Sequence, residues 1–245
     1  MDNFKKVRTG KIIKSKVKLS VIIPCYNEES NITVLFKNIK LIKKEYFEII
    51  IVNNGSTDST RALLKTLNVN LNLTIINLEK NIGYGGGILE GINFASGEVI
   101  SWTHADLQTD IRDVINSYKF YISNPNFYDF ILKGKRIKRD ILDSFFTFMM
   151  SFICSSHTGY HLTDINAQPK IFHRSFLKEL DNAPTDFSLD LFFLYRAKYS
   201  GKTILEYPVK FNNRLHGESK GGGSFFGKVK LTIRTLNYIF KIKKR

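Results

Sequence analysis

The sequence predicts an α/β protein with a mostly parallel sheet flanked by helices. Apolar runs at 19–23, 47–52, 73–78 and 98–102 alternate with segments of helical periodicity, a pattern typical of right-handed βαβ units. The runs are apolar almost throughout, which indicates strands buried on both faces. A hydrophobic fraction of 43% and a charged fraction of 24% over 245 residues suit a folded domain with a sizeable core.

The remaining elements follow in chain order. Small polar residues at 53–58 form a turn that can cap the next helix. The final strand contains Pro208, which lacks an N–H and favours an edge position. We expect helices over 29–39, 88–95, 111–122, 140–154 and 189–199, a glycine-rich loop over 81–87, and strands over 128–132, 171–172 and 203–211.

Three segments organise the chain. Residues 1–17 are predicted to be a basic N-terminal arm, and residues 18–220 a single domain without an internal repeat. Residues 221–245 begin with three glycines and continue as a basic amphipathic tail. Such a tail can pack on the domain, bind an anionic membrane leaflet or contact nucleic acid, and its pattern favours the membrane surface.

The charge narrows the choice of partners. Lys and Arg number 37 against 22 Asp and Glu, a net charge of +15, which favours phosphorylated substrates, an anionic membrane or nucleic acid over a merely solvated lysine-rich surface. No nucleic-acid recognition motif is present, so only weak non-specific binding stays open. Two cysteines exclude a disulfide framework and a zinc cluster.

The chain is expected to be cytoplasmic and peripherally attached to the membrane. Its first 18 residues lack the apolar core of a signal peptide, and no run reaches the roughly 18 apolar residues of a spanning helix. The apolar run 145–154 is either core or a membrane-docking face, and basic residues shortly before it favour the second reading.

The stretch 101–110 carries the chemistry. His104, Asp106 and Gln108 place an imidazole, a carboxylate and an amide just after a buried strand, where an open α/β sheet usually binds its ligand. Two other motifs fail: Gly83–Gly87 lacks the spacing of a dinucleotide fingerprint, and Val229 replaces the Ser or Thr of a P-loop.

Five segments together resemble the inverting family-two glycosyltransferases of GT-A fold, particularly the branch that includes dolichol-phosphate mannose synthase. Each matches a family motif, and they occur in the family's order. They are Val21–Glu29, Glu48–Asp58, Asn81–Gly91 with Ala95–Glu98, His104–Gln108, and Arg214–Lys220.

The resemblance implies a metal-dependent enzyme that moves a sugar from a nucleotide-diphosphate donor. The acceptor is then a polyprenyl phosphate or a growing glycan of the cell envelope. Asp106 and Gln108 match the positions that hold Mg²⁺ or Mn²⁺, ions that prefer oxygen ligands. Basic positions associated with the phosphates, and positions of the nucleotide pocket, match Arg136, Arg214 and Lys220, and Pro24, Tyr26, Glu28 and Asn53, respectively.

Two substitutions depart from the family pattern. His104 replaces the first Asp of the Asp-x-Asp motif, and Asn53 replaces the first Asp of the turn after the second strand. An Asn can still accept a hydrogen bond from a base N–H, and His104 can bind a ribose hydroxyl or ligate metal. A non-catalytic nucleotide-sugar sensor or scaffold is therefore the alternative function.

Asp190 and Asp164 are the candidate catalytic bases. A sugar hydroxyl as acceptor requires a carboxylate within hydrogen-bond reach, whereas a lipid phosphate is already anionic. Either Asp can instead be a helix cap or a structural hydrogen-bond acceptor.

Overall fold

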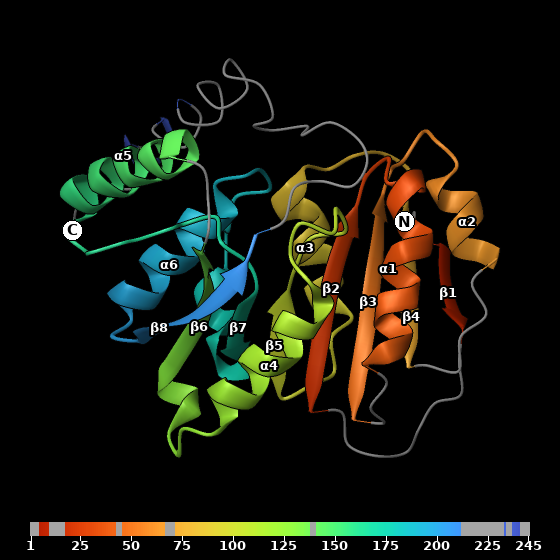
Figure 1. The fold of residues 1–245 in the computed structure, drawn as a ribbon, viewed down its shortest axis with the longest axis horizontal. Coiled ribbons are helices and arrows are strands. Elements are labelled where there is room, and N and C mark those ends of the chain that lie inside the picture. The colour runs from red at the N-terminus through yellow and green to blue at the C-terminus, as the bar shows by residue number, and fades with distance from the viewer. Residues whose placement is uncertain are drawn as a thin grey trace.

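The strands form one mixed sheet, with the chain order coloured in Figure 1. The computed structural model describes residues 5–9, 18–42, 46–66, 72–137, 141–211, 233 and 237–240. The strands are β1 (Lys5–Thr9), β2 (Leu19–Cys25), β3 (Phe47–Asn54), β4 (Leu73–Leu78), β5 (Val99–Trp102), β6 (Phe130–Ile137), β7 (Lys170–His173) and β8 (Thr203–Lys210). Their order is β1-β4-β3-β2-β5-β7-β6-β8. All run parallel except β1 and β7, which confirms the predicted class.

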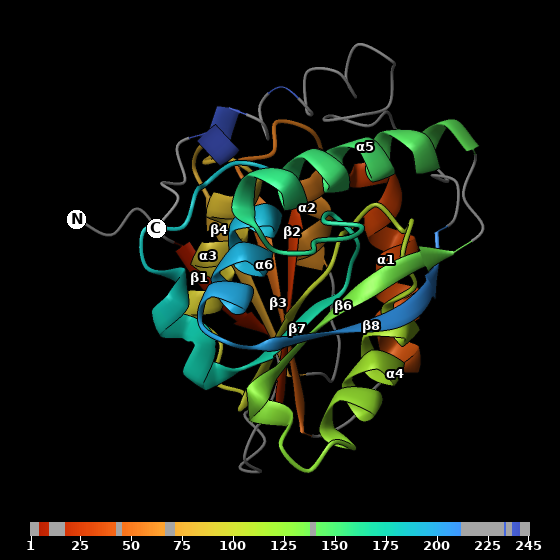
Figure 2. The same cartoon turned by 90° about the vertical axis from the view of Figure 1, so that its left-hand side faces the viewer.

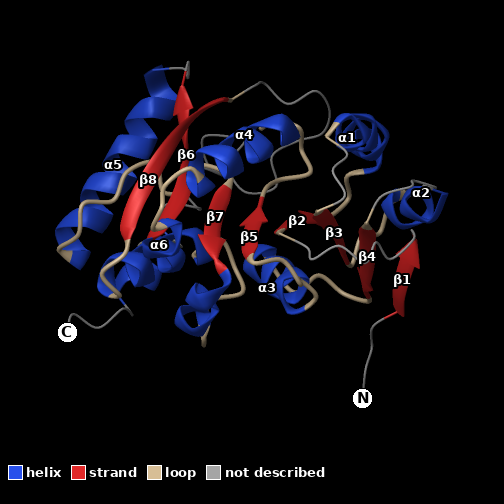
Figure 3. Ribbon diagram, turned by 90° about the horizontal axis from the view of Figure 1, so that it is seen from below, coloured by secondary structure: helices blue, strands red, loops and turns tan. Residues whose placement is uncertain are grey.

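Helices cover both faces of this sheet, as Figure 3 shows from below. One face packs against α1 (Glu29–Leu41), α2 (Thr60–Thr66) and α4 (Ile111–Ile122). The other packs against α3 (Tyr84–Asn93), α5 (Ile141–Thr158), α6 (Leu189–Tyr199) and the 3₁₀ segment η2 (Arg174–Leu180). A shorter 3₁₀ turn, η1 (Phe127–Asp129), precedes β6.

Strand geometry explains the two cores. Successive side chains of a strand point to opposite faces, so Val21 and Ile23 of β2 belong to the core under α1 and α4. Ile22, between them, belongs to the core under α3 and α6. All three are fully buried, as expected of a sheet covered on both sides.

Several elements have the predicted bounds. The helices over 111–122 and 189–199 and the strand over 73–78 agree with α4, α6 and β4. Asp110 caps α4, because its side chain accepts a hydrogen bond from the backbone N–H of Arg112 at 2.8 Å. The strand with Pro208 lies at the sheet edge as β8, paired only with β6 among the described strands.

Three expectations are corrected. Residues 5–9, assigned to a basic arm, form β1 and add an antiparallel edge to β4. The strand expected at 128–132 is β6, which continues through charged residues to Ile137. Lys133 on this strand is only 1% exposed because it pairs with Glu206 of β8, so its charge concealed the strand in the sequence.

The glycine-rich loop is the third correction, because Gly85, Gly86 and Gly87 form the first turn of α3. The N–H of Gly86 donates to the Thr185 carbonyl at 2.8 Å. A Cβ on Gly85 would lie 2.4 Å from the Pro184 carbonyl oxygen. The missing side chains allow the segment 184–186 to approach α3, and this approach outweighs the low helix propensity of glycine.

The sheet has a topological switch point beside β2. β2 pairs with β3 on one side and with β5 on the other, both parallel. The chain therefore leaves the carboxyl ends of β2 and β5 in opposite directions, which opens the usual ligand position of such a sheet. The N–H of Thr103, just past β5, donates to the Ile22 carbonyl at 3.1 Å.

Glu48 ties the opposite end of the sheet together. Its carboxylate is 7% exposed and accepts hydrogen bonds from the hydroxyl of Ser20 at 2.5 Å and from the N–H and hydroxyl of Ser96 at 2.5 and 2.9 Å. The N–H of Gly97 donates to the Ser20 hydroxyl oxygen at 2.7 Å. One buried acid thus joins β2, β3 and the turn before β5.

We predict that Glu48→Ala lowers the free energy of unfolding by about 2–4 kcal/mol, because it leaves the buried donors of Ser20 and Ser96 without their acceptor. Urea unfolding followed by circular dichroism measures this change. Glu79→Ala, on an exposed residue, is the matched control and should stay within about 0.5 kcal/mol of the parent. Equal losses in both variants would contradict the role given to Glu48.

Candidate active site

A tight turn after β5 presents the predicted metal ligands. Asp106 is 6% exposed, and its Oδ1 accepts a hydrogen bond from the N–H of Gln108 at 3.1 Å. Leu107 between them has a φ of 62°, in the left-handed region. This backbone conformation is costly for a branched side chain and is typical of functional turns. Asp106 and Gln108 therefore occupy one strained turn at the switch point.

The donor set of this turn suits a hard divalent ion. A carboxylate and an amide oxygen are ligands that Mg²⁺ and Mn²⁺ accept. Within the described ranges there is no group of three or more His, Cys, Asp or Glu side chains that could hold a metal. An ion at Asp106 and Gln108 would therefore take its other ligands from water and from a phosphorylated substrate, as Mg²⁺ commonly does.

His104 packs in an aromatic group beside this turn. Its ring lies 5.6 Å from that of Tyr84 on α3, and Tyr84 stacks on Phe187 with centroids 4.8 Å apart and planes 8° apart. Burial, and next the charge of Asp190, raise the pKa of the Tyr84 hydroxyl well above 10.0. The hydroxyl therefore stays protonated, and the group remains a neutral wall beside Asp106.

Asp190 is the centre of a buried polar network rather than an exposed base. It is 2% exposed and lies 3.1 Å from the Lys170 ammonium. Tyr84 donates its hydroxyl to Asp190 at 3.2 Å, the Trp102 indole N–H at 3.3 Å and the Gln168 amide at 3.1 Å. These contacts give Asp190 a structural role, and its assignment as a catalytic base stays a prediction.

Lys170 is held on its other side by backbone. Its ammonium donates to the carbonyls of Ile165 at 2.9 Å and Ala167 at 2.6 Å. Burial lowers the pKa of Lys170 to about 8, although the nearby carboxylate of Asp190 favours the charged form. The pair thus fastens the segment 165–168 to the first turn of α6.

Arg136 and Asp164 form a second pair, at the end of β6. The N–H of Arg136 donates to Asp164 Oδ2 at 2.8 Å, its Nε donates to Oδ1 at 2.8 Å, and its Nη2 contacts Oδ1 as well. Both side chains are 12% exposed. Burial acts to raise the pKa of Asp164, but the charge and hydrogen bonds of Arg136 hold it below the ordinary value. Asp164 is thereby a weak proton acceptor that orients Arg136.

Glu206 anchors the strand that carries Arg136. Its carboxylate accepts hydrogen bonds from Lys133 at 2.7 Å and from the Thr163 hydroxyl at 2.5 Å, and Lys135 lies 3.0 Å away. Burial acts to raise the pKa of Glu206, but hydrogen bonds from Lys133 and Thr163 and the charge of Lys133 bring it to about 2. The cluster therefore joins β6, β8 and the turn next to Asp164.

The turns after β2 and β3 are joined where the nucleotide is expected. Pro24 and Tyr26 are half-buried, and Asn27 has a φ of 54°. The N–H of Asn27 donates to the Ser56 hydroxyl at 2.9 Å, and that of Glu28 donates to the Thr60 hydroxyl at 2.8 Å. Pro24, Tyr26 and Glu28 thus share one end of the sheet, and their contacts with a nucleotide stay predictions.

Asn53 has a different position from the expected one. It is fully buried, its amide donates to Asn77 Oδ1 at 2.9 Å, and its Oδ1 accepts from the N–H of Ser56 at 3.2 Å. A direct contact of this amide with a nucleotide base is therefore not supported by the described conformation. Asn53 instead supports the turn from beneath, which the sequence did not reveal because burial at a strand end depends on neighbouring strands.

The other predicted residues fall into two groups. Arg214 and Lys220, assigned to the phosphates, lie outside the described residues, as does most of the tail. Sequence reasoning missed Tyr84, Gln168, Lys170 and Phe187. The tyrosine lay hidden in a glycine-rich stretch, and a lysine beside a short apolar run carried no sign of burial.

We predict that Glu206→Gln lowers the free energy of unfolding by about 1–3 kcal/mol at pH 7, since the loss is discounted for partial exposure. The folded pKa of about 2 lies below the ordinary 4.5, so this stabilisation is present above pH 4.5 and disappears as the pH falls through 2. Urea unfolding at pH 7, 4.5 and 3 should therefore show the difference shrinking. Glu79→Gln is the control, and a constant difference would exclude the ion cluster as its source.

Comparison with known proteins agrees with this architecture. A family model described as glycosyl transferase family 2 matches residues 20–181. The chain is 25% identical over 236 residues to a dodecaprenyl-phosphate galacturonate synthase of Rhizobium johnstonii, covering 94% of this chain and 69% of that protein. It is 27% identical over 241 residues to a dolichol-phosphate mannosyltransferase of Pyrococcus furiosus, covering 93% of this chain and 64% of that protein.

A solved structure shares the fold. The mannosyltransferase of Pyrobaculum calidifontis in complex with GDP-Man and Mn²⁺ has a TM-score of 0.65 and 18% identity, covering 97% of this chain and 67% of that one. The chain thus spans about two thirds of the length of these relatives (69%, 64% and 67%). With this GT-A fold and a family match over residues 20–181, the chain belongs to glycosyl transferase family 2.

Proposed function

We propose that this chain transfers one sugar, with inversion, from a nucleoside-diphosphate sugar to a polyprenyl phosphate at a membrane surface. The observation that carries the proposal is the turn at Asp106 and Gln108, which lies at the switch point of a family-two fold. Two relatives are named for polyprenyl- or dolichol-phosphate products, which favours a lipid phosphate over a surface glycan as acceptor.

In the proposed reaction, an anionic phosphate oxygen of the acceptor attacks the anomeric carbon of the donor. The bond from that carbon to the diphosphate oxygen breaks, and the nucleoside diphosphate leaves with the bonding electrons. Asp106 and Gln108 would hold Mg²⁺ or Mn²⁺, which would neutralise charge on the leaving diphosphate. The neighbouring structure solved with GDP-Man and Mn²⁺ supports a divalent ion but does not choose between the two metals.

The protein groups around the turn divide the remaining work. The turns of Pro24–Glu28 would hold the nucleotide, and the aromatic group of His104, Tyr84 and Phe187 would exclude water beside the diphosphate. Arg136, oriented by Asp164, would bind a phosphate through its forked donors. A phosphate acceptor requires no general base, which agrees with the buried, fully engaged position of Asp190.

We predict that Asp106→Asn lowers kcat/KM by at least about 100-fold, because a neutral amide binds a divalent ion far more weakly than a carboxylate. Sugar transfer to a short isoprenyl phosphate, measured with a panel of UDP and GDP sugars and Mn²⁺, tests this change. Asp181→Asn makes the same chemical change on an exposed residue and should keep near-parental turnover.

The same assay separates the alternative function. Saturable donor binding by the parent protein without release of UDP or GDP would favour the sensor or scaffold and overturn the transferase. Transfer to a glycan but not to the isoprenyl phosphate would replace the proposed acceptor. Near-normal turnover of Asp106→Asn would remove this residue from the metal site.

A further inference from the structure

The helix α5 is apolar on two opposite faces, and only one of them packs on the protein. Met150 is 9% exposed and Cys154 fully buried, both within the core shared with α6. The turn after α5 is tied back to the same side, since the N–H of Leu162 donates to the Ser155 hydroxyl at 2.9 Å. This face is an ordinary amphipathic contact with the domain.

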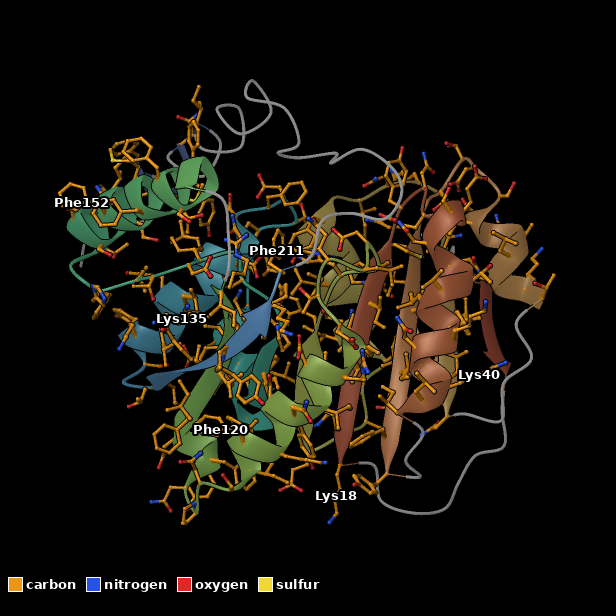
Figure 4. All side chains as sticks on the ribbon, viewed as in Figure 1. Lys18, Lys40, Phe120, Lys135, Phe152 and Phe211 are labelled. Atoms are coloured by element: carbon orange, nitrogen blue, oxygen red, sulfur yellow. The ribbon has the colours of Figure 1, made fainter. Side chains whose placement is uncertain are left out.

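The other face carries a row of large apolar side chains in water. Phe145, Phe148, Met149 and Phe152 are 57%, 64%, 38% and 58% exposed. Their spacing of i, i+3, i+4 and i+7 places them on one stripe of the helix. The rings of Phe148 and Phe152 stack with centroids 6.4 Å apart, and Figure 4 shows Phe152 at the outer side of α5. We call these four residues the α5 stripe.

A further exposed aromatic residue lies near the end of the helix. Phe240 is 68% exposed, and its ring lies 5.1 Å from that of His157 in the last turn of α5. Its neighbour Ile239 is fully buried in the core, so the short segment 237–240 is anchored. Exposed apolar residues elsewhere, such as Leu41 and Phe120, belong to other elements, and single ones of this kind need no partner.

The charge next to the stripe selects its partner. Residues 133–139 read KGKRIKR, five basic positions in seven immediately before the helix. Lys135 is 59% exposed and lies at the same end of the molecule as Phe152 (Figure 4). Apolar residues beside Lys and Arg match an anionic bilayer, which takes the first into its acyl boundary and attracts the second. A second copy of a chain with a net charge of +15 would instead be repelled.

The helix is also built for a surface rather than a span. Among the described residues, no helix has the length and hydropathy needed to cross a membrane. α5 lies across the top of the molecule in Figures 1 and 2, and it follows β6, which ends in the same direction as β2 and β5. The bilayer would therefore meet the protein on the side where the candidate active site lies.

We propose that α5 lies flat on an anionic bilayer, with the α5 stripe inserted at the boundary between headgroups and acyl chains. The loop with Asp164 contacts the back of this helix, where Asn166 Nδ2 lies 4.0 Å from Met150 Sδ. Docking would thus hold the Arg136–Asp164 pair close to lipid headgroups. Bilayer binding stands on the stripe alone, whereas delivery of a lipid phosphate to Arg136 rests on the proposed function.

Vesicle co-sedimentation of the full chain tests the docking surface. The vesicles contain phosphatidylcholine alone or mixed with phosphatidylglycerol, and the variants are Phe148→Ser/Phe152→Ser and the control Leu41→Ser/Phe120→Ser. The stripe variant should lose binding to the anionic vesicles by about tenfold or more, because two large apolar side chains no longer insert. The control should bind like the parent, and phosphatidylcholine alone should bind all proteins weakly.

Three results would overturn the docking surface. They are equal binding of the stripe variant and its control, no binding by the parent, and a parental dimer in light scattering that the stripe variant abolishes without any change in vesicle binding. The last would assign the stripe to a second copy of the chain. Unchanged thermal unfolding of both variants is required for the comparison, and partial exposure of all four side chains makes it the expected result.

A second acceptor separates this proposal from the proposed function. The stripe variant should transfer sugar to a water-soluble short isoprenyl phosphate at the parental rate, but it should lose transfer to a long polyprenyl phosphate in vesicles. Loss of transfer to both acceptors would overturn the assignment of the stripe to membrane docking. Parental inactivity on both, together with stripe-dependent vesicle binding, would overturn the proposed function and leave the docking surface standing.

Discussion

The buried ion pair of Asp190 and Lys170 is the constraint on which the active-site side of the fold depends. Both side chains are almost inaccessible to water, and an unpaired charge there would cost several kcal/mol. Burial is tolerated because Tyr84, Trp102 and Gln168 donate to the carboxylate while two carbonyls accept from the ammonium. These donors come from α3, β5 and the segment before β7, so the network aligns elements that are distant in sequence.

The same network reaches the chemistry indirectly. Tyr84 connects the Asp190 carboxylate at its hydroxyl end with His104 and Phe187 at its ring. The turn of Asp106 and Gln108 lies directly after β5, whose last residue, Trp102, also binds Asp190. A rigid, dry support of this kind suits a site that must hold a metal and a diphosphate, since misplaced ligands are costly in catalysis. Asp190 can thus matter for activity without touching a substrate.

The two ends of the strand β6 illustrate how stability and function are combined. Near its middle, Lys133 is buried against Glu206, and at its end Arg136 is clamped by Asp164. Beyond that pair the chain enters α5, where the apolar stripe remains in water. The first two arrangements bury charge with complete pairing, whereas the stripe exposes apolar surface, which soluble monomers rarely do in one patch. We attribute that exposure to an interface.

The sequence by itself determined the α/β class, most element bounds, the turn at Asp106 and Gln108 and the family, because apolar periodicity, turn residues and motif order are local properties. Tertiary structure alone decided the pairing of Lys170 with Asp190, the inward position of Asn53, the helical glycines of α3 and the edge strand β1. It also decided which face of α5 is covered. These features depend on contacts between residues far apart in the chain, whose free energy outweighs local propensity and leaves no periodic trace.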